Sequence, residues 1–219
     1  MPDDIAPLNR LGVIIPYTDR EEDGSAYHVL LPEREEDGTL ALEASVFSGS
    51  DLSERYQDGF MPYSREALVQ FARTLNDVPY GYGDLHCHYD CSSYVSLVYR
   101  CFGIFLPRNS ADMLHAKGLT VVDLTAMEDE EKETLIMEHP GAIIFLPGHV
   151  MLSTGEVHPP DYGTRAGIIH CNTAYYSEPD GDPAHYVVTE KVLENLIARC
   201  FSVSGRSFLT KAEALIFAE

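Results

Sequence analysis

The chain has 219 residues, 45% of them hydrophobic, which is enough to bury a sizeable core in one or two domains. Its net charge of -20, from 35 acidic and 15 basic residues, repels phosphate backbones and anionic membranes, so no nucleic-acid partner is expected. No stretch approaches the roughly 18 uninterrupted apolar residues of a membrane span, and the first residues lack the basic and apolar regions of a secretory signal. We therefore expect a cytoplasmic protein, or an exported one if a leader precedes this sequence.

The first part of the chain is predicted to form short strands. They are separated by charged turns with Asp-Gly at 23–24 and 37–38, and they cover LGVIIPY (11–17), AYHVLLP (26–32) and LALEASVF (40–47). This pattern indicates a small β-barrel, or part of one, in a first domain over residues 1–60. The acidic run EREED (33–37) is interpreted as a solvated face without a function.

A second domain, residues 61–219, begins with helical periodicity. SREALVQFARTL has apolar residues at helical spacing behind Ser64, whose hydroxyl can cap the first turn. After the loop VPYGYGD (78–84), the run CSSYVSLVYRCFGI predicts a buried helix that begins near Cys91 and stops at Gly103.

The remainder of the chain is predicted to be rich in strands. Its segments are short, β-branched and separated by Gly, Pro or Asp, as in an antiparallel sheet: GAIIFLPG, HVMLSTG, RAGIIH and HYVVTE. The acidic run EDEEKE (128–133) is interpreted as solvated, and TKAEALIFAE (210–219) as a closing helix. The order of elements predicts an α+β domain.

The stretch LHCHYDCSS, residues 85–93, concentrates groups that can carry chemistry. A zinc site could use His86, Cys87, His88 and Cys91, but no second ligand cluster occurs elsewhere in the sequence. A redox pair is disfavoured because Cys87 and Cys91 have three residues between them, where the thioredoxin-like motif has two. The irregular spacing of the five cysteines does not indicate a disulfide framework.

Cys91 can also be a nucleophile. A thiol in the first turn of a helix lies at the positive end of the helix dipole, which can lower its pKa from about 8.5 into the neutral range. The alternative from spacing alone is that Cys91 is a small apolar core residue. Residue patterns do not choose between these two interpretations.

Three short motifs occur in a characteristic order: Asp-Cys-Ser opening a helix, Leu-Pro-Arg-x-Ser after that helix, and Gly-His-Val opening a strand. With AYHVLLP and GFMPYSREALVQFARTLNDVPYGYGD before them, they make residues 26–172 resemble the NlpC/P60 cell-wall cysteine peptidases that carry an N-terminal bacterial SH3-like domain. The resemblance implies a papain-like α+β fold, in which the helix bearing the cysteine packs on an antiparallel sheet, preceded by an SH3-like barrel.

The resemblance also implies catalytic roles. Cys91 would be the nucleophile, His149 the general base, and His170 the third polar residue that orients the base. The chemistry is coherent, since an imidazole can take the thiol proton and return it to the leaving amine. The alternative is that both histidines are ordinary strand residues with satisfied hydrogen bonds.

Three further residues receive binding roles from the resemblance. Tyr80 would join the backbone N–H of Cys91 in stabilising the oxyanion, or would only line the cleft wall. Asp90 and Ser92 would hold the ammonium of an N-terminal L-alanine, or would cap the helix. The family's Trp-Gly-Gly is replaced by Tyr-Gly-Asp at 82–84, and a frequent glutamine by Met113, so substrate preference is less certain than the reaction.

The expected activity, which the resemblance implies, is cleavage of murein peptides between γ-D-glutamate and the following diamino acid, lysine or diaminopimelate. The expected substrates are peptides with a free N-terminal L-Ala. No cofactor or metal is expected, and the acidic chain suits a released muropeptide better than an anionic wall polymer. Two alternatives are a catalytically silent murein-binding module and the zinc protein described above.

Overall fold

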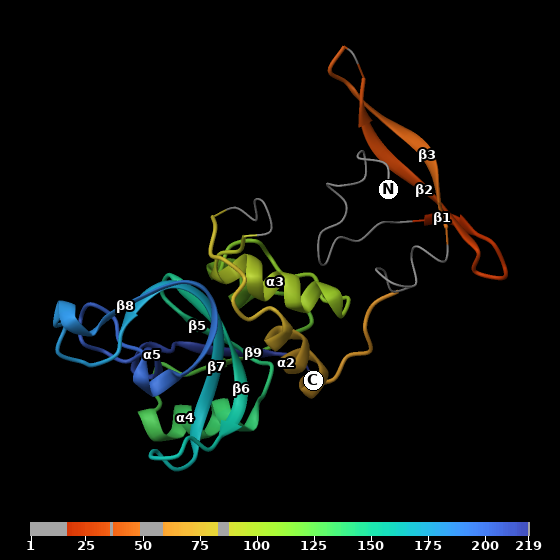
Figure 1. The fold of residues 1–219 in the computed structure, drawn as a ribbon. Coiled ribbons are helices and arrows are strands. Elements are labelled where there is room, and N and C mark those ends of the chain that lie inside the picture. The colour runs from red at the N-terminus through yellow and green to blue at the C-terminus, as the bar shows by residue number, and fades with distance from the viewer. Residues whose placement is uncertain (1–16, 36, 49–58, 83–87, 219) are drawn as a thin grey trace. The chain divides into compact units, whose positions relative to one another are not determined.

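The structure is a computed structural model that describes residues 17–35, 37–48, 59–82 and 88–218. The chain divides into two compact units, Met1–Met61 and Pro62–Glu219, which are described separately (Figure 1). The domain types predicted for residues 1–60 and 61–219 stay predictions. Among the described residues, no helix is both long and apolar enough to cross a membrane.

The first unit contains a three-stranded antiparallel sheet in the order β1 (Tyr17–Arg20), β2 (Ala26–Arg34) and β3 (Leu40–Ser48). Both predicted Asp-Gly turns are present, and their glycines, Gly24 and Gly38, have φ of +71° and +85°, which glycine adopts without steric cost. The strand predicted over 11–17 lies outside the described residues except for its last residue. The three-stranded sheet is smaller than the predicted barrel, whose closure stays a prediction.

The two helices predicted for the second unit are confirmed. Helix α2 (Arg65–Thr74) begins after Ser64, whose Oγ accepts the Ala67 N–H at 3.1 Å. Helix α3 (Cys91–Cys101) buries its apolar side and is followed by Gly103 at φ +80°. The hydroxyl of Tyr94 on α3 donates to the Ala72 carbonyl of α2 at 3.1 Å, which joins the two helices.

The predicted antiparallel sheet has six strands. Its order is β4 (Thr120–Asp123), β9 (Ala214–Phe217), β5 (Ile143–Leu146), β6 (His149–Val157), β7 (Arg165–Tyr176) and β8 (Tyr186–Leu196). The other elements of this unit in the described ranges are α4 (Asp129–Glu138), α5 (Phe208–Lys211) and the 3-10 helices η2 (Ala111–His115), η3 (Pro183–His185) and η4 (Ile197–Arg199).

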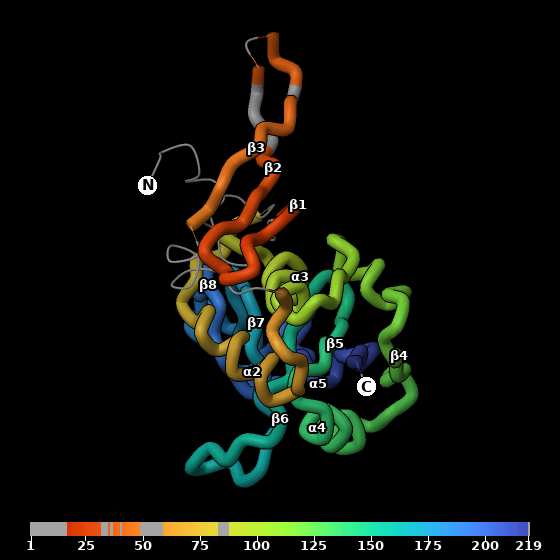
Figure 2. The backbone as a smooth tube through the Cα atoms, turned by 90° about the vertical axis from the view of Figure 1, so that its right-hand side faces the viewer, coloured from red at the N-terminus to blue at the C-terminus, as the bar shows by residue number. Residues whose placement is uncertain are grey.

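Helices cover both faces of this sheet. Alternate strand residues such as Met151, Ile168 and Leu215 form one hydrophobic cluster with Ile136 of α4 and Phe208 of α5. Helix α3 contacts β6 and β7, and Figures 1 and 2 place it on the side away from α4. The second unit is therefore an α+β domain in which the sheet is buried between two helical layers.

Two predictions about the second unit are wrong. The closing helix is mostly strand β9, because all four residues of β9 are buried and pair with both β4 and β5, and this pairing outweighs helix propensity. The run 128–133 is not fully solvated, because it starts α4 and buries Lys132 and Glu133. Lys132 Nζ donates to the carbonyls of Thr210 and Ala212, and Glu133 accepts the Ala166 N–H.

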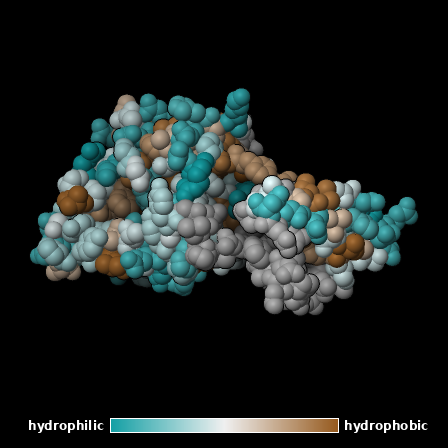
Figure 3. All heavy atoms as spheres, turned by 90° about the horizontal axis from the view of Figure 1, so that it is seen from above, coloured by the Kyte–Doolittle hydropathy of each residue, from teal (hydrophilic) through white to brown (hydrophobic). Residues whose placement is uncertain are grey.

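The surface in the view of Figure 3 is mostly hydrophilic, with hydrophobic residues in separate patches. This agrees with the excess of acidic residues in the chain, 35 against 15 basic ones.

We predict that Tyr99→Phe lowers the free energy of unfolding by about 1 kcal/mol. The buried hydroxyl of Tyr99 donates to the Gly141 carbonyl at 2.7 Å, so its removal leaves a carbonyl near the start of β5 without that donor. Urea denaturation measures the change. Tyr186→Phe, at a tyrosine that is 49% exposed, is the control and should be neutral; equal stability of the two variants would contradict the role of the buried bond.

Candidate active site

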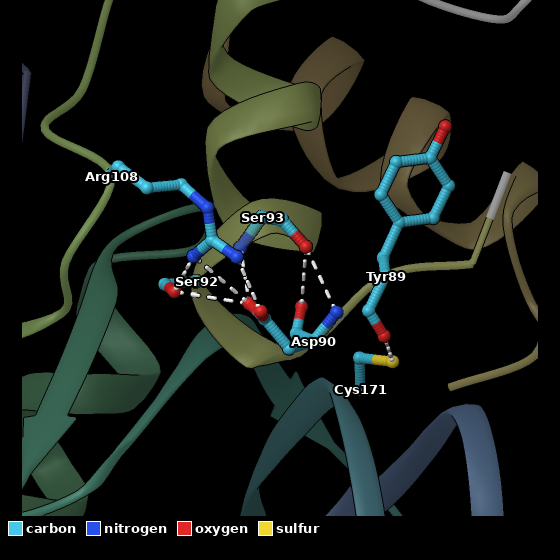
Figure 4. Close-up of polar contacts among 6 residues, drawn as sticks. All are labelled: Tyr89, Asp90, Ser92, Ser93, Arg108 and Cys171. Carbon is cyan, nitrogen blue, oxygen red and sulfur yellow. Dashed lines mark hydrogen bonds and ion pairs between the residues drawn. The ribbon is translucent and has the colours of Figure 1, made fainter. Parts of the chain in front are cut away.

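The start of α3 is fixed by the carboxylate of Asp90 (Figure 4). Asp90 is 4% exposed, and its Oδ1 accepts the N–H of Ser93 at 2.9 Å, while the Ser93 hydroxyl accepts the N–H of Asp90 at 2.8 Å. This reciprocal capping box satisfies backbone groups that an uncapped helix end would leave without partners. It places Cys91 at the first helical position.

Arg108 holds the same carboxylate from the loop after α3. Its Nη2 lies 2.5 Å from Asp90 Oδ2, and its Nη1 donates to Asp90 Oδ1 at 3.3 Å and to Ser92 Oγ at 2.8 Å. Burial alone would raise the pKa of Asp90, but the hydrogen bonds from Arg108 and Ser93 hold it below its usual value. Of the two predicted roles of Asp90, helix capping is therefore observed, and sequence reasoning gave no role to Arg108 of the Leu-Pro-Arg-x-Ser motif.

The thiol of Cys91 lies among backbone N–H groups. Hydrogen bonds from the backbone of Val150, Ser92 and Cys91 itself favour the thiolate, yet the pKa of Cys91 is raised. Burial is the main cause, and the neighbouring charge of Asp90 adds to it. The predicted lowering by the helix terminus is thus wrong for the resting site, because desolvation outweighs it.

His149, the first residue of β6, and His170, in the middle of β7, form a pair. Nε2 of His149 and Nδ1 of His170 are 3.0 Å apart, and Phe208 packs against both rings. Burial, followed by the positive charge of Lys211, lowers the pKa of His149 to about 4. Burial also lowers the pKa of His170 well below its usual value, and Nε2 of His170 has no hydrogen-bond partner among the described residues. Both imidazoles are therefore neutral at pH 7.

The predicted catalytic residues converge on the start of β6 without a completed contact. The backbone of Val150 is hydrogen-bonded to the Cys91 thiol, and Val150 directly follows His149. Within the described part of the chain, no hydrogen bond joins the Cys91 thiol to the His149 ring. Such contacts are often long in the absence of substrate, so the role of His149 as base stays a prediction.

Tyr80 lies close enough to Cys91 and Asp90 for their negative charges to affect the pKa of its hydroxyl. Burial raises the pKa of Tyr80, and negative charge at Cys91 and Asp90 raises it further. Its backbone is held by an N–H bond to the Glu190 carbonyl at 2.7 Å and by a bridge to Tyr89. Its hydroxyl role stays a prediction.

The positions that depart from the family pattern have different surroundings. Tyr82 is 83% exposed, Met113 is fully buried, and residues 83–84 lie outside the described residues. His86 and Cys87, on which the zinc alternative depends, also lie outside them. Within the described ranges, no group of three or more His, Cys, Asp or Glu side chains is placed to hold a metal.

Cys171 is a second thiol near the site that sequence analysis did not single out. It follows His170 on β7, and its Sγ donates to the Tyr89 carbonyl at 2.8 Å, which ties β7 to the segment before α3 (Figure 4). Burial raises its pKa to about 12, and the charges of Cys91 and Asp90 contribute. The observed role of this buried thiol is therefore that of a hydrogen-bond donor between two elements of the fold.

The fold and the site define a class: an α+β domain with a cysteine at a helix start and a histidine pair on the neighbouring antiparallel sheet. Residues 77–174 match the sequence model of the NlpC/P60 family. This segment is therefore similar to the NlpC/P60 family, whose members are generally cysteine peptidases. No curated protein matches the chain at a significant level.

Solved structures show a similar fold. An NlpC/P60 endopeptidase from Photobacterium damselae subsp. piscicida superposes with a TM-score of 0.62 at 17% identity, over 94% of this chain and 47% of that one. An NlpC/P60 family protein from Bacillus cereus ATCC 10987 gives a TM-score of 0.49 at 16% identity, over 92% of this chain and 52% of that one. The chain thus spans about half the length of these structures, and the first of them supports the fold alone.

We predict that His149 makes the protein less stable in acid. Its pKa is about 4 when folded and about 6.5 when unfolded, so between these values the unfolded chain binds a proton that the folded chain does not. The stability is fully present above pH 6.5 and is lost as the pH falls toward 4.

The measurement is urea denaturation of wild type and His149→Gln at pH 7 and pH 5. The loss of unfolding free energy between these pH values should be smaller in the variant by about 2 kcal/mol. An identical loss in both proteins would show that the imidazole is not shielded from protonation in the folded state.

Proposed function

We propose that the chain is a cysteine endopeptidase that hydrolyses the bond between γ-D-glutamate and the diamino acid of murein peptides. The observation that carries the proposal is the histidine pair at the start of β6, one residue from the backbone that is bonded to the Cys91 thiol. Together with the family match, this pair supports the proposal that Cys91 is the nucleophile and His149 its neutral base.

In the proposed reaction, the resting thiol and imidazole are both neutral. Nε2 of His149 faces His170, so Nδ1 is the nitrogen left to accept the proton of the Cys91 thiol. The sulfur attacks the amide carbonyl, and the imidazolium then protonates the leaving amine as the C–N bond breaks. Water attacks the thioester and releases the γ-glutamyl carboxylate and the thiol.

The oxyanion formed during the attack needs donors that are already in place. The backbone N–H of Cys91, at the first position of α3, is one candidate, because helix-start N–H groups have no intrahelical acceptor. The Tyr80 hydroxyl is the second candidate, since Tyr80 lies within electrostatic range of the thiol.

We further propose a preference for released peptides with a free N-terminal L-Ala. Asp90 is a buried carboxylate next to the nucleophile, and Ser92 lies beside it. Because Arg108 already bonds both groups, a substrate ammonium would share the carboxylate with Arg108. The net charge of -20 also favours a small soluble substrate over an anionic wall polymer.

We predict that Cys91→Ser abolishes hydrolysis and leaves the fold intact, because a hydroxyl is a far weaker nucleophile than a thiol. Mass spectrometry of L-Ala-γ-D-Glu-diaminopimelate digests measures the products. Cys101→Ser, at the other end of α3, is the matched control and should retain activity. Cys87→Ser should also be active. Loss of activity in a folded Cys87→Ser variant would indicate that Cys87, and not Cys91, is the nucleophile. An active Cys91→Ser would refute the mechanism.

We predict that acetylating the substrate's amino group lowers kcat/KM about thirtyfold, equivalent to about 2 kcal/mol. The change removes the positive charge that Asp90 would bind and adds bulk at the same place. Free and acetylated peptides are compared side by side with the same enzyme. Equal rates would mean that the cleft is open at this end and that the enzyme also accepts stems still joined to glycan.

A further inference from the structure

The short helix α5 covers the histidine pair from outside the segment that matches the family. The Phe208 ring centroid lies 5.8 Å from that of His149 and 6.1 Å from that of His170. Phe208 is 7% exposed and belongs to the same hydrophobic cluster as Met151 and Ile168, which stand two residues from the histidines along β6 and β7. One aromatic ring therefore closes the apolar side of both imidazoles.

Helix α4 anchors α5 in this place through polar contacts. Lys132, 4% exposed, donates from Nζ to the carbonyls of Thr210 at 3.1 Å and Ala212 at 3.0 Å. The Thr210 hydroxyl donates to Asp129 Oδ2 at 2.6 Å. The Phe208 N–H donates to the Cys200 carbonyl at 2.7 Å. A buried ammonium without the two carbonyls would be costly, so the contacts of Lys132 hold the backbone that follows Phe208.

The charges around the pair do not favour protonation. Helix α5 contributes the ammonium of Lys211, and Cys91, Cys171 and Cys200 are the thiols on neighbouring elements, all with raised pKa values. In the described ranges, no carboxylate is bonded to either imidazole. The pair thus depends on packing, not on an anion, to keep one arrangement.

We propose that Phe208, anchored through α5 by Lys132, is a positioning residue that holds the His149–His170 pair as one neutral, hydrogen-bonded unit. The inference rests on the proposed function, in which His149 is the base. In that role Nε2 of His149 carries the proton donated to Nδ1 of His170, and Nδ1 of His149 stays free of a proton. Phe208 limits rotation of both rings and excludes the water that would solvate an imidazolium.

The test compares Phe208→Leu with Phe217→Leu. Phe217 is a matched control, because it is 9% exposed, belongs to the same hydrophobic cluster, and packs on His139 at 4.3 Å between ring centroids. NMR of the imidazole 15N and 1H nuclei reports the pKa and the tautomer of each histidine. The resonances of the pair are assigned by their loss in His149→Gln and His170→Gln. Peptide hydrolysis gives kcat and KM against pH.

In Phe208→Leu, the pKa of His149 should rise by about 1 unit, with a mixture of tautomers. The apparent pKa on the acidic side of the kcat/KM–pH profile should rise by the same amount. The kcat should fall about tenfold, with little change in KM. Lys132→Met removes the contacts that hold α5 but leaves the Phe208 ring in place. In this variant the pKa of His149 should also rise, by a smaller amount. Phe217→Leu should leave titration and pH profile as in wild type.

Unchanged titration of His149 in folded Phe208→Leu would overturn the inference, and so would an equal shift in Phe217→Leu. If Phe208→Leu does not fold, Phe208→Met, which preserves more of the volume, is titrated with the same criterion. Failure of the wild type to cleave any murein peptide would refute the proposed function and leave the titration readout intact, so the two failures are distinguishable.

Discussion

The rest of the candidate site depends on the buried carboxylate of Asp90, because this one group makes three separate interactions. It caps α3, receives the guanidinium of Arg108, and accepts the hydroxyl of Ser92. A buried carboxylate without such partners would take up a proton or destabilise the fold. The direction of α3, the position of Cys91 and the path of the loop that carries Arg108 all follow from satisfying this one charge.

Burial, more than the helix dipole, sets the charge state of the site. It raises the pKa of Cys91 despite the surrounding N–H groups, and it lowers the pKa of both histidines. A preformed thiolate–imidazolium pair is therefore disfavoured at rest. Under the proposed function, proton transfer would therefore be coupled to the arrival of a substrate whose developing charge is stabilised in the same place.

Local signals predicted much of the fold. Ser64 and Gly103 mark real helix ends, and the strand segments are where β-branched residues occur. Prediction from the sequence was wrong where long-range strand pairing determines the secondary structure. The apolar run of β9 is compatible with a helix, and it forms a strand because it pairs with β4 and β5. Helix α4 was missed because its acidic start resembled a solvated loop. In the site, the motifs indicated Cys91, but they did not indicate that Arg108 binds Asp90 or that Phe208 packs on the histidine pair, because only the tertiary fold brings these residues together.

Strand β9 also has a consequence for how the domain is made. It lies between the edge strand β4 and β5, so this position in the sheet is filled by residues 214–217, which are synthesised after the other five strands. Until they leave the ribosome, the edges of β4 and β5 that face each other have no partner, and chain-distant pairing of this kind is slow. The nascent domain therefore exposes two unpaired strand edges late in synthesis, and these can pair with other chains until β9 fills the space between them.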